Sequence, residues 1–182
     1  MNKAEDVVVA QLEAWGFRCE PFSKREMRAG KTPDRRVYLG QHLAFFIEVK
    51  EVVQDDFLGG ARDDPRFNRL ASDIHEAVKQ FDAVNPHREY VNILAFVNND
   101  SMCGSLDLNA VLTGNALTGS GEAMPIYNRQ ARGRIRDEKF RIDAYLWLDQ
   151  SVPAKMFLNQ HDRRHQPRVR VYFDPIFGGQ TG

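Results

Sequence analysis

Two side chains with opposite charge stand two residues apart in an apolar segment, the Phe45–Glu51 run FFIEVKE. Because side chains alternate between the two faces of a β-strand, Glu48 and Lys50 are expected on one face, together with Phe46. Burying either charged group alone is costly, so each needs a partner or a metal ion. The segment therefore predicts a buried carboxylate and amine that emerge side by side from an apolar strand.

A second carboxylate, that of Asp34, precedes Glu48 by fourteen positions and follows Pro33. It stands at the head of the preceding predicted strand, so a hairpin would bring it near Glu48. Two carboxylates with a nearby lysine suit a Mg²⁺ or Mn²⁺ site for phosphodiester hydrolysis. We expect Asp34, Glu48 and the carbonyl of Val49 to hold the ion. Lys50 is expected to orient the attacking water or to stabilise the charge that builds on phosphorus.

The order Pro33-Asp34, thirteen intervening residues, then Glu48-Val49-Lys50 resembles the PD-(D/E)xK signature of restriction-endonuclease-like nucleases. The resemblance implies their fold, a mixed β-sheet flanked by helices, and Mg²⁺-dependent cleavage of DNA or, less often, RNA. It covers roughly residues 3–97, whereas residues 101–182 match no pattern that we recognise. Many such nucleases dimerise to cut both strands, so the resemblance leaves a homodimer open.

The short acidic-x-lysine pattern is not specific by itself, because Asp137-Glu138-Lys139 also matches it. That second match lacks an upstream Pro-Asp and stands among arginines, whereas Pro33-Asp34 is the only Pro-Asp in the chain. A surface Pro-Asp turn and a buried Glu–Lys ion pair are the structural alternative. The functional alternatives are an RNA-cleaving nuclease and a non-catalytic nucleic-acid-binding or assembly module on the same fold.

Two further side chains are candidates for the site. Many nucleases of this superfamily place a glutamate of the first helix near the metal, and Glu5 shares a helical stripe with Val8 and Leu12. The alternative is a capping box in which Asn2 is the N-cap and Glu5 is the third helical residue. Some recombination-type members carry a glutamine or lysine on the second helix facing the site. Gln80 and Lys79 are the candidates here, against the alternative of a solvated helix face.

The elements that must position these residues follow from periodicity and breaker residues. We expect helices at residues 3–15 and 70–84, a long polar loop at 54–68, and strands at 17–22, 36–39, 42–53, 90–97, 142–148 and 168–173. The second and third strands form a hairpin, and residues 101–122 are rich in glycine, serine and threonine. This order predicts one α/β or α+β domain over residues 1–182, with its core at about 3–97 and a C-terminal elaboration at 98–177.

Composition fits a soluble globular protein of one domain, with 182 residues, 42% hydrophobic and 27% charged. Formal net charge is zero, but arginines gather at Arg129, Arg132, Arg134 and Arg136, where we expect contacts to nucleic-acid phosphates. A solvated charged surface is the alternative for this cluster. No apolar run is long enough for a bilayer, and the N-terminus turns acidic where a signal peptide would be apolar. The sequence therefore predicts a cytoplasmic protein without a membrane partner.

Overall fold

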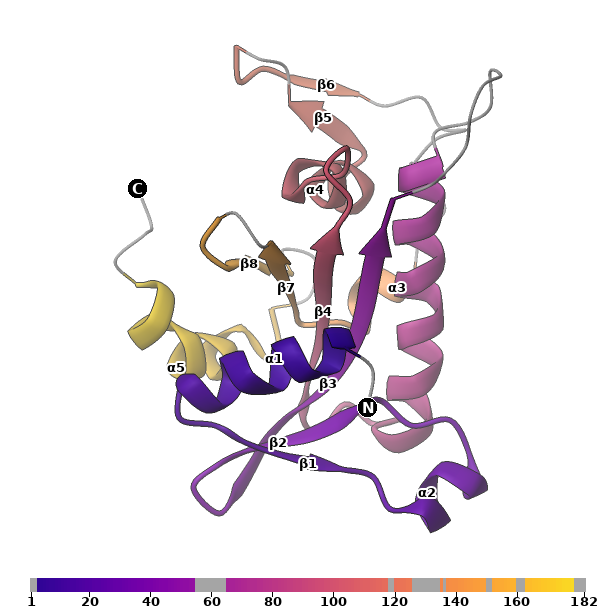
Figure 1. Ribbon diagram of the computed structural model, residues 1–182, viewed down its shortest axis with the longest axis vertical. Helices are drawn as coiled ribbons and strands as arrows, with labels where there is room; N and C mark the ends of the chain where they lie inside the picture. The colour runs from indigo at the N-terminus through magenta and orange to yellow at the C-terminus, as the bar shows by residue number, and fades with distance from the viewer. Residues whose placement is uncertain are drawn as a thin grey trace.

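The computed structural model describes residues 3–54, 65–117, 120–125, 135, 137–149, 152–159 and 163–178. Within these residues the chain is an α+β fold built on one six-stranded mixed sheet with helices on both faces (Figure 1). The elements are α1 (Lys3–Ala14), β1 (Arg18–Pro21), α2 (Lys24–Ala29), β2 (Arg35–Leu39), β3 (His42–Val53), α3 (Pro65–Val84), β4 (Val91–Asn99), α4 (Ser105–Thr113), β5 (Asn115–Leu117), β6 (Ala123–Pro125), the 3₁₀ turn η1 (Glu138–Phe140), β7 (Ala144–Asp149), β8 (Lys155–Leu158) and α5 (Gln166–Phe177).

The strand order of the main sheet is β1-β2-β3-β4-β7-β8. The predicted hairpin is confirmed, since β2 and β3 pair antiparallel, while β3, β4 and β7 run parallel through the centre. The twelve-residue strand β3 is buried along most of its length, which explains its continuous apolar sequence. β7 and β8 lie beyond residue 97, so the predicted C-terminal elaboration contributes two strands to the main sheet.

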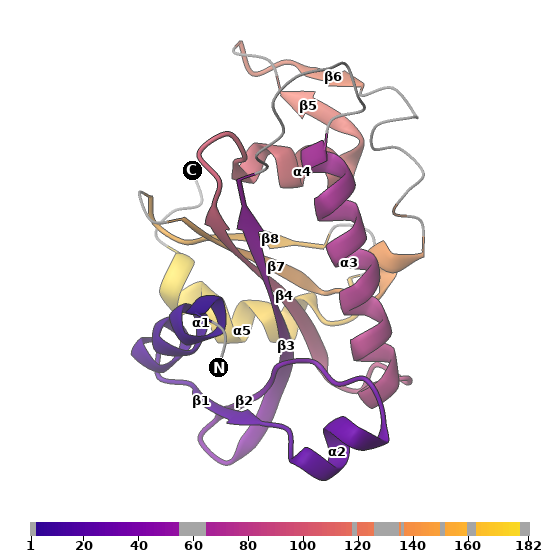
Figure 2. The ribbon, with the colours of Figure 1, turned by 45° about the vertical axis from the view of Figure 1, so that its right-hand side comes forward.

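Each face of the sheet has its own core. On one face Phe45, Ile47 and Val49 of β3 pack with residues of α1 and α5. On the other face Phe46 packs with residues of α3, including Leu70 and Ile74. Figure 2 shows α3 on the opposite side of the sheet from α1 and α5. The alternation of side chains along β3 thus divides it between two helical layers.

Three sequence predictions are corrected by the structure. The predicted strand at 168–173 is wrong, because these residues belong to helix α5. The alternation Arg-Val-Arg-Val imitates a strand, yet Val169 and Phe173, four residues apart, are the buried pair, and Pro167 occupies the first turn, where proline is tolerated. The predicted loop at 54–68 is too long, since α3 begins at Pro65; residues 55–64 lie outside the described residues. Six elements, α2, α4, β5, β6, η1 and β8, were not predicted from the sequence.

Helix α4 lies in the segment whose glycine and serine content suggested irregular structure. Gly104 precedes the helix, and its backbone N–H donates to the carboxylate of Asp107 at 2.7 Å. Gly114 ends the helix with a φ of 74°, a left-handed conformation that glycine adopts without strain. The glycines therefore mark the two ends of a helix.

A buried polar cluster joins the amino ends of β4 and β7, centred on the carboxylate of Asp143. One oxygen of this carboxylate accepts from the guanidinium of Arg88, and the other accepts from the backbone N–H of Asn92 at 2.8 Å. Nδ1 of His165 lies 3.4 Å from that second oxygen. Because β4, β7 and the start of α5 meet here, we assign this Asp143 cluster a structural role.

Candidate active site

The period of β3 brings Glu48 and Lys50 to the α3 face of the sheet. Glu48 pairs in register with Leu94 of β4, one of the buried residues of the α3-side core. Its side chain is only 3% exposed, and its Oε1 lies 3.0 Å from Nζ of Lys50. The structure thus places the carboxylate and the amine side by side, as the sequence pattern predicts.

Asp34 reaches the same place from the start of the neighbouring strand. The β2–β3 register pairs Arg35 with Ile47, so its continuation by one residue sets Asp34 opposite Glu48. Asp34 Oδ2 accepts a 2.7 Å hydrogen bond from the backbone N–H of Val49. Because β2 begins only at Arg35, the Asp34 side chain, and not a strand carbonyl, accepts from the Val49 N–H. This hydrogen bond holds Asp34 beside Glu48.

The electrostatics of Glu48 are those of a carboxylate kept from water. Burial, followed by the nearby charge of Asp34, raises the pKa of Glu48 to about 8, against the opposing effects of Lys50 and Gln80. Its second oxygen, Oε2, is buried and has no hydrogen-bond partner among the described residues. A buried oxygen without a partner costs free energy. This arrangement is favourable only when a cation or a proton is added to it.

Glu5 and Gln80 approach this pair from the two helical layers. Glu5 of α1 lies near the carboxylate of Asp34 and accepts from Arg35 at 2.8 Å. Its pKa is raised by burial and then by the Asp34 charge. Asn2 lies outside the described residues, so the alternative capping box of Glu5 stays a prediction.

Gln80 of α3 contributes from the other side of the sheet. Its side-chain amide donates to the carbonyl of Thr32 at 3.1 Å, and it lowers the pKa of the nearby Glu48 carboxyl. Lys79, the neighbouring candidate on α3, is exposed instead. The structure therefore brings together Asp34, Glu48, Lys50, Glu5 and Gln80, and it leaves Lys79 outside.

Two acidic residues of α3 belong to the site although the sequence did not single them out. Oε2 of Glu76 lies 3.5 Å from Nζ of Lys50. Burial raises the pKa of Asp73 to about 6, with Lys50 acting in the opposite direction. The available signal was helical spacing, since Asp73, Glu76 and Gln80 stand three and four residues apart and share a helix face. Only the fold shows that this face meets Lys50.

A cleft of about 630 Å³ opens onto the site from the solvent. Lys50, Glu76 and Gln80 form its inner wall. The outer wall is formed by Met27, Gly30, Lys31 and Thr32, which belong to α2 and the segment that follows it. The buried charged pair therefore has an entrance large enough for a substrate group.

The donor set is small, which restricts the metal that it fits. Among the described residues there is no group of three or more His, Cys, Asp or Glu side chains arranged to hold a metal ion. Asp34 and Glu48 offer two carboxylates, and Val49 between Glu48 and Lys50 has a backbone carbonyl. Mg²⁺ is commonly bound by one or two carboxylates, with water and substrate phosphates as its other ligands. The unpartnered Oε2 of Glu48 provides a free ligand atom, so the residues fit Mg²⁺ or Mn²⁺.

The predicted phosphate-contacting residues Arg129, Arg132, Arg134 and Arg136 lie outside the described residues. Among the helices that the structure describes, none is both long and apolar enough to cross a membrane.

Neither a scan against models of protein families nor searches of curated proteins and of solved structures found a match for this chain.

Proposed function

We propose that the chain is a divalent-metal-dependent nuclease of the PD-(D/E)xK kind that hydrolyses phosphodiester bonds in DNA. The observation that carries the proposal is the buried Glu48 carboxylate. It lies beside Lys50 and under the influence of Asp34, and its free oxygen belongs to a site with a solvent cleft. A purely structural ion pair would gain nothing from a second carboxylate, which makes Glu48 harder to ionise.

Asp34, Glu48 and the Val49 carbonyl would hold Mg²⁺ or Mn²⁺. When bound, the ion would polarise the scissile phosphate and lower the pKa of the attacking water. Lys50 would stabilise the negative charge that develops on the phosphate oxygens, or orient the water, from its position 3.0 Å from Glu48. Glu5 and Gln80 would help to position the site, Glu5 through its ion pair with Arg35 beside Asp34 and Gln80 through its hydrogen bond to the Thr32 carbonyl.

Several features of this proposal rest on the sequence alone. DNA is the proposed substrate because the resembling nucleases cleave it most often, and the same chemistry serves RNA. Action in the cytoplasm is part of the same proposal. A homodimer that cuts both strands is the arrangement that the resemblance leaves open.

The direct test is an assay on linear, circular and branched DNA, with Mg²⁺ and with EDTA, using the wild type and Lys50→Ala. We expect cleavage that requires Mg²⁺ and falls by about 100- to 1,000-fold in Lys50→Ala, because a positioned charge-stabilising group is lost. Lys79→Ala is the matched control, since Lys79 is an exposed lysine of α3 that does not line the cleft. Cleavage that persists in EDTA or in Lys50→Ala would contradict the proposal. Metal-independent binding without cleavage would favour the non-catalytic nucleic-acid-binding module.

A further inference from the structure

The outer wall of the cleft is formed by α2, a six-residue helix inserted between β1 and β2. Its first residue follows a capping box, in which the Ser23 backbone N–H donates to Glu26 at 2.8 Å and the Glu26 N–H donates to the Ser23 hydroxyl at 3.3 Å. This reciprocal pair satisfies two backbone donors at the start of the helix. The short helix is therefore formed by specific local contacts.

Side-chain contacts also tie α2 to the sheet. Glu26 forms an ion pair with Arg36 of β2, and the Arg36 guanidinium lies 3.9 Å from the centre of the Phe22 ring. Phe22 is buried and stacks on Phe46 of β3 at 6.1 Å. The single acidic residue of α2 is therefore directed toward the sheet, and the helix is held in a defined position beside β3.

The outward surface of this segment carries four exposed cations, Lys24, Arg25, Arg28 and Lys31. Within the described part of the chain none of them forms an ion pair or a hydrogen bond through its side chain. Lys24 and Arg25 stand four and three residues before Arg28, so the three side chains are neighbours on the helix surface. Like charges at this spacing destabilise a helix. The cluster therefore does not stabilise α2, and its charge is available for a ligand.

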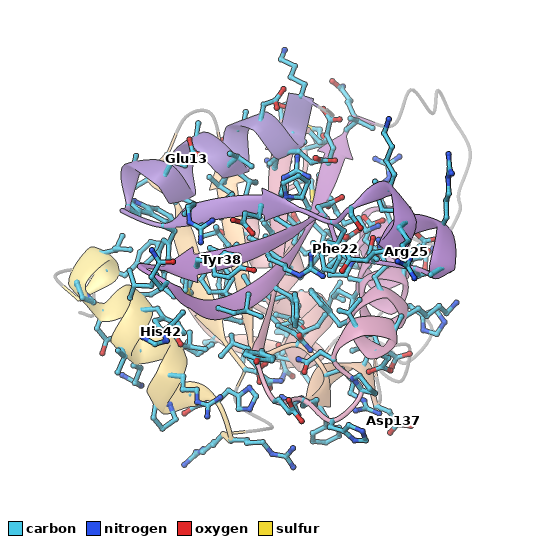
Figure 3. The ribbon with its side chains drawn as sticks, turned by 90° about the horizontal axis from the view of Figure 1, so that it is seen from below. Glu13, Phe22, Arg25, Tyr38, His42 and Asp137 are labelled. Atoms are coloured by element: carbon cyan, nitrogen blue, oxygen red, sulfur yellow. The ribbon has the colours of Figure 1, made fainter. Side chains whose placement is uncertain are left out.

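This cationic surface continues into the candidate active site. Lys31 lines the same cleft as Lys50, so one of the four exposed cations shares a solvent-filled space with the half-buried lysine of the site. Met27, which is 52% exposed, lies at the edge of the cleft and offers an apolar surface to a sugar or a base. Figure 3 shows Arg25 and Phe22 at the α2 end of the molecule, on the opposite side from α5.

We propose that α2 and the residues after it bind the phosphodiester backbone of the nucleic acid next to the bond that is cleaved. Lys24, Arg25, Arg28 and Lys31 contact successive phosphates, and the strand passes Met27 to reach Lys50. This inference rests on the proposed nuclease function, and it names a substrate-binding surface within the described residues. A chain with a net charge of zero then concentrates its attraction for phosphate where the substrate must enter.

The test compares two variants that each lose two exposed arginines. Arg25→Gln/Arg28→Gln removes charge from α2, and Arg163→Gln/Arg170→Gln removes the same charge beside and on α5, where both side chains are also exposed. Binding of labelled single-stranded DNA, duplex DNA and RNA is measured by fluorescence anisotropy in EDTA, where no metal-dependent cleavage occurs. The salt concentration is varied from about 50 to about 200 mM. Circular dichroism checks that all proteins are folded.

We expect the α2 variant to bind at least ~10-fold more weakly, and its plot of log affinity against log salt to lose about 1.4 to 1.8 in slope, because two phosphate contacts are lost. The α5 variant should match the wild type. Lys24→Gln/Lys31→Gln, a second α2 variant, should reduce the slope by a similar amount. A duplex or RNA preference in the wild type would identify the form of the backbone that α2 selects.

Unchanged binding by both α2 variants would overturn the inference, as would equal weakening in the α5 variant or no binding by the wild type. Metal-dependent cleavage together with unchanged binding in the α2 variants would remove α2 from the substrate path while the nuclease assignment stands. Binding that depends on α2 without any cleavage would keep α2 as a nucleic-acid-binding surface and contradict the nuclease assignment.

Discussion

Two of the carboxylates that the structure buries, Glu48 of β3 and Asp143 directly before β7, have different surroundings. Both oxygens of Asp143 have partners, one the Arg88 guanidinium and the other the Asn92 backbone N–H. Glu48 is equally buried, but only Oε1 has a partner, Lys50, and a second carboxylate lies nearby. Proteins commonly give up stability at functional sites and satisfy buried polar groups elsewhere. The comparison therefore supports a structural role for the Asp143 cluster and the chemistry that we propose for the Glu48 site.

Removal of the Asp143 carboxylate is the largest change that we predict for stability. Asp143→Ala leaves Arg88 buried without its counter-charge, and breaking a buried pair in this way costs about 3–5 kcal/mol. Urea denaturation measures the loss. The matched control is Asp82→Ala, which removes a half-exposed partner of Arg141 at 3.5 Å and should cost about 1 kcal/mol or less.

If the two substitutions cost the same, the Asp143 cluster does not have the structural role that the comparison assigns to it. The fraction of Asp143→Ala that remains folded should still cleave DNA, because the cluster contacts none of the five candidate site residues in the structure described here.

Replacement of Glu48 should increase the stability of the fold at high pH, whereas replacement of Asp143 decreases it. The pKa of Glu48 is raised from 4.5 to about 8, so the folded state holds a proton that the unfolded state releases. The metal-free wild type should therefore lose stability as the pH rises from about 4.5 to about 8. Glu48→Gln cannot ionise, keeps an oxygen for Lys50 and should be more stable at pH 8, by about 1–3 kcal/mol.

This gain should disappear near pH 4, where the wild-type carboxyl is protonated in both states. Denaturation curves at both pH values, without metal, measure the difference. A Glu48→Gln protein that is less stable than the wild type at pH 8 would mean that the Glu48–Lys50 pair contributes more to the fold than it costs.

Gln80 tests the outer part of the site and should have the smallest effect. It donates to the Thr32 carbonyl next to Asp34 and lowers the pKa of Glu48. Gln80→Ala should lower metal-dependent cleavage by about 10-fold, because one hydrogen bond that orders the wall of the site is lost, and leave some activity. Steady-state cleavage compared with Lys79→Ala measures this. A loss as large as that of Lys50→Ala would give Gln80 a direct part in the chemistry.

The centre of the site could be predicted because it depends on local rules. The two-residue period of β3 places Glu48 and Lys50 on one face, and a hairpin connection brings Asp34 alongside. The rest depends on tertiary contacts. The face of α3 that carries Asp73 and Glu76 meets Lys50 only through helix packing. Met27 of α2 and the following Lys31 line the cleft only because Phe22 and Arg36 hold that helix against the sheet.

The errors in the predicted elements have a similar origin. The alternating valines before Phe173 satisfy the strand period, and only the packing of Val169 and Phe173 against the sheet face decides for a helix. Glycines around α4 predict irregular structure when their role as helix ends is not recognised. Local patterns thus indicate which residues are available for a contact, and tertiary packing determines which contacts form.

Calorimetric titration of Mn²⁺ into the wild type, Asp34→Asn, Glu48→Gln and Asp6→Asn tests the central claim most directly. Asp6 is an exposed acidic residue of α1 and serves as the control. We predict saturable Mn²⁺ binding to the wild type and to Asp6→Asn, and its loss in both Asp34→Asn and Glu48→Gln. A wild type that binds no Mn²⁺ would contradict the account. So would Mn²⁺ binding that is unchanged in Asp34→Asn or in Glu48→Gln.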